Sequence, residues 1–166
     1  ARLPWLLIGM IGGIGNSMIL GNFDSTFAAH PEMALYIPLI GGTGGNVGTQ
    51  SSAIIVQGLA NSSLDAKNTF KQITKESVVA LINATIISLL VYTYNFIRFG
   101  ATATVTYSVS ISLFAVVMFA SIFGTLVPMT LEKLKIDPAI ATGPFIAITN
   151  DIIGMMLYMG ITVLLS

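Results

Sequence analysis

The feature that most constrains this chain is a series of long apolar stretches separated by short polar connections. Each of five stretches approaches or exceeds the roughly 20 apolar residues that a helix needs to cross the hydrocarbon core of a membrane. Only 8% of the residues are charged, against about 25% in an ordinary soluble domain. The sequence therefore predicts an all-α integral membrane protein with five transmembrane helices. They are expected at residues 3–20, 33–60, 73–97, 104–131 and 139–164.

Positive charge is distributed unevenly over the connections, and this distribution predicts the orientation of the chain. With the N-terminus in the cytoplasm, six of the seven Lys and Arg residues lie inside and only Arg98 lies outside. The six are Arg2, Lys67, Lys71, Lys75, Lys133 and Lys135. We therefore expect a cytoplasmic N-terminus, an outside C-terminus and an odd number of spans.

The second apolar stretch is interrupted by glycines and polar side chains between Pro38 and Gln50. Each glycine inside a helix costs about 1 kcal/mol relative to alanine, and an amide side chain in hydrocarbon needs a polar partner. We therefore expect this helix to approach another backbone closely, or to face something polar. The glycines are Gly41, Gly42, Gly44, Gly45 and Gly48. In the first stretch, a close contact between helices is predicted at Gly9, Gly12, Gly13 and Asn16.

Asp151 is the acidic residue that lies deepest in an expected span, while the other six lie in connections or near helix ends. It lies about 12 residues, or roughly 18 Å, into the fifth helix, which is near the bilayer midplane. No Lys or Arg is expected at that depth to pair with it. Such a carboxylate costs at least a few kcal/mol unless it meets water, a cation or a partner. We favour a cation or proton site; the alternatives are a protonated Asp bonded to neighbouring backbone and an inert water pocket.

The glycine-rich helix and the fifth helix are expected to meet at Asp151. They run in opposite directions, and Asn46 lies about 11 residues from the outer end of its helix, so that both side chains reach a similar depth. Gly42, Asn46, Thr49 and Ala53 share one helix face by their spacing. Gly45, in the same stretch, is a further candidate site residue. Helices weakened by glycine and proline can expose carbonyl oxygens to an ion at the midplane. We therefore predict an ion pathway between these two helices.

The predicted ligands are carboxylate, amide and carbonyl oxygen atoms, and the lack of cysteine excludes thiolate ligands. Oxygen ligands suit hard cations such as magnesium or calcium. One carboxylate per chain is too little for a dehydrated divalent ion, but it suits a magnesium ion that keeps its waters. A homodimer would bring two Asp151 carboxylates around one axis. The net charge is zero and so does not indicate a nucleic-acid partner. His30 is not arranged with a nucleophile or an acid in a way that supports catalysis.

Three motifs resemble the membrane domain of the MgtE family of magnesium channels. They are RLPWLL at residues 2–7, YIPLIGGTGGNVGTQ at residues 36–50 and DPAIATGPFIAITNDIIG at residues 137–154. The resemblance covers the whole chain. It implies a multi-pass protein of the cell membrane (inner or plasma), a homodimer, and a pore along the two-fold axis that the second and fifth helices line.

The resemblance also implies roles for individual residues. Asp151 matches the pore aspartate that recognises hydrated magnesium, the transported ion. Gly143 stands where family members often have Asn, so no side-chain contact is expected there. Along the ion pathway the matching positions are Asn46, Thr49, Ala147 and Gly154, with Asp137 near the cytoplasmic entrance.

Typical family members carry cytoplasmic magnesium-sensing regions, including a paired CBS module, before the membrane domain. Residues 1–166 hold no such region. We therefore expect a single transmembrane domain, either part of a longer protein or a short form.

The expected function is passive transport of divalent cations, chiefly magnesium, and not enzymatic catalysis. One alternative is a proton- or sodium-coupled carrier of divalent cations that uses Asp151. Another is a non-conducting membrane scaffold, in which Asp151 and the glycines affect stability alone.

Overall fold

The structure, a computed structural model, describes residues 2–139 and 143–166, and every regular element within these ranges is helical. Four of the described helices, α1, α4, α5 and α6, are long and apolar enough to cross a membrane. Helix α3 has 24 residues but is not one of the four, because its glycines and polar side chains lower its hydropathy. The elements are α1 (Leu3–Gly21), α2 (Asp24–Ala29), η1 (Pro31–Tyr36), α3 (Ile37–Ala60), η2 (Ala66–Asn68), α4 (Thr69–Phe99), α5 (Thr104–Lys133) and α6 (Pro144–Leu165).

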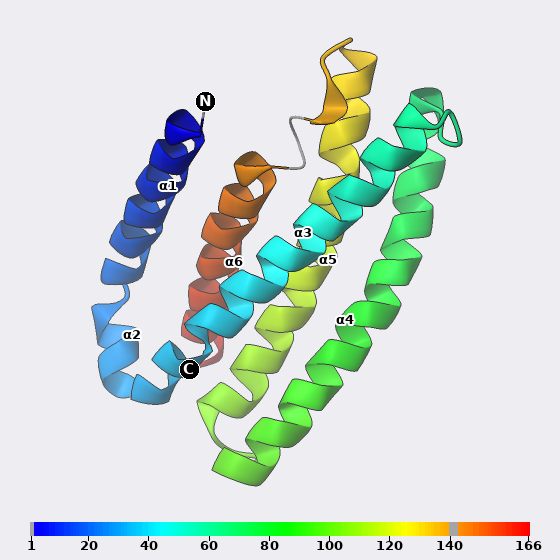
Figure 1. Ribbon diagram of the computed structural model, residues 1–166. Coiled ribbons are helices and arrows are strands. Elements are labelled where there is room, and N and C mark those ends of the chain that lie inside the picture. Colours follow the sequence, from blue (N-terminus) through cyan, green and yellow to red (C-terminus); the bar gives the residue numbers. More distant parts are fainter. Residues whose placement is uncertain (1, 140–142) are drawn as a thin grey trace.

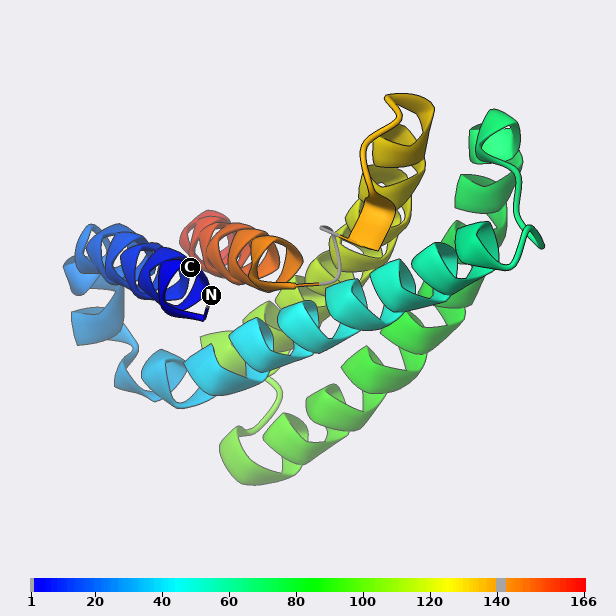
Figure 2. The same ribbon diagram turned by 45° about the horizontal axis from the view of Figure 1, so that its top comes forward.

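Helix α5 forms the centre of the bundle and packs against α3, α4 and α6. Figure 1 shows α3 crossing in front of α5 and α6, with α4 on one side of α5 and α6 on the other. Helix α1 packs on α6 and forms the edge of the bundle opposite α4, as the turned view in Figure 2 also shows. Helix α5 therefore contributes more buried side chains than any other helix of the described residues.

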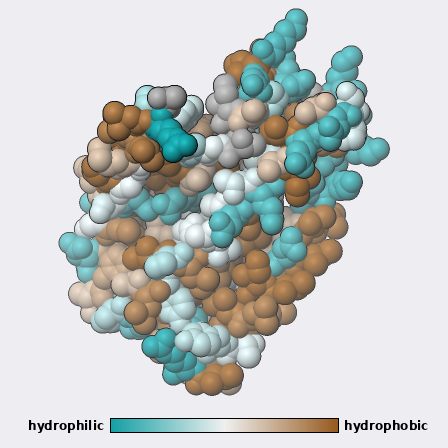
Figure 3. Space-filling model, viewed as in Figure 1, coloured by the Kyte–Doolittle hydropathy of each residue, from teal (hydrophilic) through white to brown (hydrophobic). Residues whose placement is uncertain are grey.

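The connections gather at the two ends of the bundle. The N-terminus, the connection from α3 to α4 and the end of α5 lie at one end, whereas α2, η1 and the turn between α4 and α5 lie at the other (Figure 1). Helices α1 and α6 consequently run parallel, and α3 runs against them. Figure 3 shows hydrophilic side chains at the first end and a broad apolar surface over α4. Exposed apolar residues of α4 include Val78, Leu81, Ile82, Ile86, Leu89 and Leu90, as expected of a surface in contact with lipid.

Buried polar side chains tie the helices to one another. The hydroxyl oxygens of Ser108 on α5 and Thr162 on α6 lie 2.7 Å apart. The hydroxyl of Tyr158 on α6 donates to the carbonyl of Met33 in η1, also at 2.7 Å. These side chains are buried where no water competes, so each bond fixes the position of α6 against its neighbours.

Glycines set the close spacing of α3 and α5. A Cβ built on Gly124 of α5 would lie 2.6 Å from the carbonyl oxygen of Gly48 on α3. A Cβ on Gly44 would lie 2.9 Å from Cγ1 of Val116. The prediction that the glycine-rich helix approaches another backbone closely is confirmed here, because only a residue without a side chain fits at these points.

Three predicted helix starts differ from the structure. Helix α3 begins at Ile37, after the 3₁₀ helix η1, and not at Met33. Helix α6 begins at Pro144, so the predicted start at Ala139 is wrong; residues 140–142 lie outside the described residues. Proline favours the first turn of a helix and holds the residue before it in extended backbone, and Gly143 has φ −102° and ψ −152°. Helix α4 begins at Thr69, so the basic segment before the predicted third span forms its first turns.

Candidate ion-binding site

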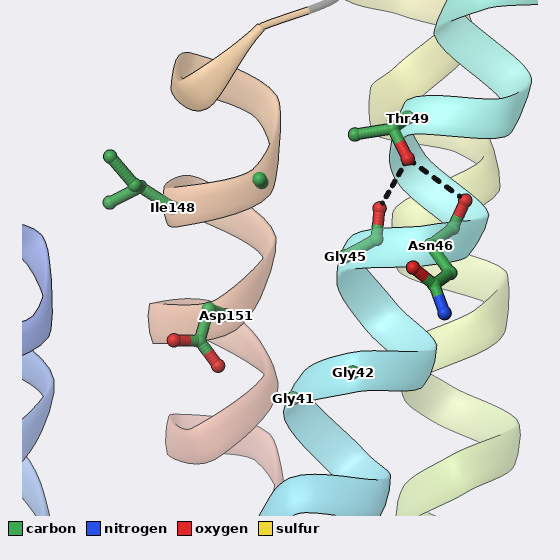
Figure 4. A pocket seen from close by; sticks show the side chains of 8 residues that line it. Gly41, Gly42, Gly45, Asn46, Thr49, Ile148 and Asp151 are labelled. Atoms are coloured by element: carbon green, nitrogen blue, oxygen red, sulfur yellow. Dashed lines mark hydrogen bonds between the residues drawn. The ribbon is translucent and has the colours of Figure 1, made fainter. Parts of the chain in front are cut away.

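An open cavity of about 390 Å³ lies between α3 and α6. Figure 4 shows the α3 residues of this cavity following one another along the helix, across from Asp151 on α6. Most of the lining residues are small, so the two helices leave room between them. The cavity is lined by Gly41, Gly42, Gly45, Asn46 and Thr49 from α3 and by Ala147, Ile148 and Asp151 from α6.

The carboxylate of Asp151 lies between three helices. Its Oδ2 accepts a hydrogen bond from Nδ2 of Asn16 on α1 at 3.2 Å. Its Oδ1 lies against Gly41 of α3, where an added Cβ would overlap it. Any larger residue at position 41 must therefore displace the carboxylate. Both contacts leave the Asp151 side chain partly exposed to the cavity.

Asp151 is the one charged residue among those that line the cavity. Its hydrogen-bond donor, Asn16, is a neutral amide. Within residues 2–139 and 143–166, no three His, Cys, Asp or Glu side chains lie close enough together to hold a metal ion. A bare divalent ion, which takes about six or more oxygen ligands, would lack ligands here. A hydrated ion brings most of its ligands as water and needs only outer contacts.

The α3 wall of the cavity offers oxygen atoms. The hydroxyl of Thr49 donates to the carbonyl of Gly45 at 2.9 Å and lies 3.2 Å from that of Asn46 (Figure 4). Because the hydroxyl proton is used within the helix, the Thr49 oxygen is left as an acceptor. The Asn46 side chain is exposed and adds an amide group to the same wall.

The structure brings five of the predicted site residues to this one cavity: Gly45, Asn46, Thr49, Ala147 and Asp151. Gly154 is buried on another face of α6, where a Cβ would lie 3.8 Å from both γ carbons of Val116. Asp137 lies exposed in the connection before α6, and its Oδ1 accepts a hydrogen bond from the backbone N–H of Ala139 at 3.0 Å. Neither Gly154 nor Asp137 lines this cavity.

Sequence reasoning missed the bond between Asn16 and Asp151. The close helix contact predicted for the first span is present at Gly12, where a Cβ would overlap Cγ2 of Ile148, whereas Gly9 and Gly13 have no such neighbour within 4 Å. The signal for the bond was an amide side chain in the middle of an apolar helix, because such a group needs a polar partner. The sequence did not indicate which partner it has.

The family assignment follows from comparison with known proteins. The profile of the MgtE family, described as a divalent cation transporter, matches residues 37–161. The chain is 33% identical over 160 residues to the magnesium transporter MgtE of Bacillus subtilis, which covers 96% of this chain and 35% of that protein. The chain is also 33% identical over 165 residues to the magnesium transporter MgtE of Thermus thermophilus, and this match covers 99% of this chain and 36% of that protein.

The magnesium transporter MgtE of Enterococcus faecalis is 30% identical over 163 residues, which are 96% of this chain and 35% of that protein. The chain thus spans little more than a third of the length of these curated relatives. These relatives are transporters and not enzymes. With its apolar helices, the chain is a multi-pass membrane protein that belongs to the MgtE family of divalent cation transporters.

Proposed function

We propose that this chain forms a passive pore for divalent cations, chiefly magnesium, in the plasma membrane. Helices α1, α3, α4, α5 and α6 each span the membrane, with the N-terminus in the cytoplasm and the C-terminus outside. Two copies assemble so that α3 and α6 of each line the pore. The names of the similar proteins, all magnesium transporters, support the choice of ion.

The observation that carries the proposal is a carboxylate on an open cavity of the bundle that has no positively charged partner among the described residues. Asp151 lines a space of about 390 Å³ whose other lining residues carry no charge. A carboxylate at membrane depth is costly unless it meets water or a cation. Two unit charges about 4 Å apart attract each other by about 4 kcal/mol at an effective dielectric constant of about 20. A divalent ion doubles this attraction and offsets the cost.

The size of the cavity supports a hydrated ion. Magnesium gives up its waters reluctantly and usually keeps several of them in a protein site. Six waters occupy about 180 Å³ at about 30 Å³ each, and the cavity of about 390 Å³ exceeds this volume. The ion would therefore pass Asp151 with its waters, which donate hydrogen bonds to the carboxylate and to backbone carbonyls of α3 and α6.

The open side of the cavity supports a homodimer. A second copy placed across the cavity would close the pathway and add a second Asp151, so that two carboxylates offset the two charges of the ion. It would also cover the polar face of α3, with Gly42, Asn46 and Thr49, which is unsuited to lipid. We propose that Asp137 and Gly154 lie along the same pathway beyond this cavity, with Asp137 at the cytoplasmic entrance.

The test is magnesium flux into liposomes that contain the chain, with Asp151→Asn as the variant. We expect the substitution to lower flux at least about tenfold, because losing about 1.4 kcal/mol of a larger attraction already has that effect. Asp24→Asn, which removes an equal charge from the exposed helix α2, is the matched control and should keep wild-type flux. Wild-type flux and ion selectivity in Asp151→Asn would refute the site.

The same liposomes separate the pore from a coupled carrier that protonates Asp151. Flux through a pore needs only the magnesium gradient, and it continues when the proton and sodium gradients are abolished. Flux that stops without one of those gradients would replace the pore by the carrier. Measuring calcium, manganese and cobalt in parallel gives the order of selectivity.

A further inference from the structure

Helix α1 contributes an amide group to the candidate ion-binding site although it does not line the cavity. Nδ2 of Asn16 donates to Oδ2 of Asp151 at 3.2 Å. The acceptor is a carboxylate, and hydrogen bonds to ionised groups are the stronger class. Asp151 therefore has one oxygen bonded to α1 and the other packed against Gly41 of α3.

The packing of α1 on α6 places this amide at the carboxylate. Gly12 lies directly against Ile148, and a side chain at position 12 would overlap it. Asn16 follows Gly12 by one helical turn, and Asp151 follows Ile148 by nearly one turn on the parallel helix α6 (Figure 1). Contact at the glycine thus brings the next turn of α1 to Asp151.

The burial pattern of α1 indicates that Asn16 is not there to stabilise packing. Asn16, with 8% of its surface exposed, is the only buried residue of this mostly apolar helix. Its Oδ1 is buried and has no hydrogen-bond partner among the described residues. An unpaired buried acceptor is destabilising, and an apolar side chain of the same size would avoid that cost. What the amide provides is its N–H at Asp151.

We infer that Asn16 is a positioning residue for the ion-binding carboxylate, an inference that rests on the proposed function. Its N–H and the backbone at Gly41 hold the two carboxylate oxygens from opposite sides, so that the group keeps one orientation at the cavity. Without the amide, the carboxylate rotates about its side-chain bonds and an arriving hydrated ion must order it. Loss of Asn16 therefore weakens ion binding and leaves the width of the pathway unchanged.

Magnesium uptake by liposomes, measured against magnesium concentration, tests this inference. Asn16→Leu removes the donor at nearly constant volume, and Ser17→Ala, at an exposed position next to it, is the matched control. We expect Asn16→Leu to raise the half-saturating magnesium concentration about tenfold while maximal flux stays within about twofold of wild type, since a tenfold change is about 1.4 kcal/mol of binding. Ser17→Ala should match wild type in both quantities.

An unchanged half-saturating concentration in Asn16→Leu overturns the inference, whether or not maximal flux falls, because lower flux alone means fewer folded channels. If size-exclusion chromatography shows that Asn16→Leu does not fold, Asn16→Ser is judged by the same two quantities. Asp151→Asn in the same series separates the two hypotheses. If Asp151→Asn lowers magnesium flux while the Asn16 variants keep wild-type half-saturating concentrations, only the positioning role is refuted. If Asp151→Asn itself keeps wild-type flux, the proposed site is refuted.

Discussion

Replacing Gly41 by alanine tests whether the glycine-rich helix exists to make room for the carboxylate of Asp151. The new Cβ would overlap Oδ1 of Asp151 and lie 3.6 Å from Cε of Met155. The α3 backbone is packed between α5 and α6, so the carboxylate is the group that moves. Moving it away from α3 pushes it towards Asn16 on α1 and distorts the hydrogen bond between them, so that its contribution is lost.

The expected magnitudes follow from these contacts. A hydrogen bond to a charged group contributes about 1.5–3 kcal/mol, and alanine returns about 1 kcal/mol of helix propensity. The variant should therefore be less stable by about 0.5–2 kcal/mol. Moving the carboxylate from about 4 Å to about 5 Å from a divalent ion weakens the attraction by about 1.7 kcal/mol at an effective dielectric constant of about 20, which is more than tenfold in binding.

The assay is magnesium flux in liposomes against concentration, beside Gly42→Ala as the control. Both glycines line the cavity, so each substitution adds one methyl group to the same wall, but a Cβ on Gly42 has no neighbour within 4 Å. We expect Gly41→Ala to raise the half-saturating magnesium concentration about tenfold and Gly42→Ala to leave it near wild type. Equal effects of the two substitutions would refute the reasoning, since narrowing of the cavity would then explain both.

Two further predictions concern stability, measured by thermal unfolding in detergent. Gly124→Ala should lower the free energy of unfolding by about 1–3 kcal/mol through overpacking, because its Cβ would lie 2.6 Å from a carbonyl oxygen of the facing α3 backbone. The control is Gly160→Ala, whose Cβ has no neighbour within 4 Å and which should be at least as stable as wild type. Equal unfolding midpoints of the two variants would contradict the close contact at Gly124. Tyr158→Phe should lower the free energy of unfolding by about 1–3 kcal/mol, because it leaves the carbonyl of Met33 without the hydroxyl donor at 2.7 Å. The control is Tyr92→Phe at an exposed position, which should unfold like wild type. A wild-type unfolding midpoint for Tyr158→Phe would rule out a contribution of this hydrogen bond to stability.

The membrane class and the long helices were predictable because they depend on local properties of the sequence. Apolar length and scarce charge exclude a soluble fold. Helix ends can follow local signals, as where α4 ends before Gly100, whose φ of 86° suits glycine. The start of α6 was mispredicted because apolar residues continue before Pro144, and hydropathy does not register the extended backbone that proline imposes on Gly143. Hydropathy also does not select α3 as a span, since its glycines and amides lower the average.

That Asp151 and the glycine-rich α3 line one cavity followed from the sequence, because a lone carboxylate and a run of glycines are both costly in an apolar segment. Tertiary structure decided how the carboxylate is held. The partners Asn16 and Asp151 are 135 positions apart, and whether they meet depends on the rotation and spacing of α1 on α6, which Gly12 sets. Local sequence determines that a helix forms and which residues share a face, but only packing determines which faces of distant helices touch. For that physical reason the charge was predictable, while its contacts with Gly41 and Asn16 were not.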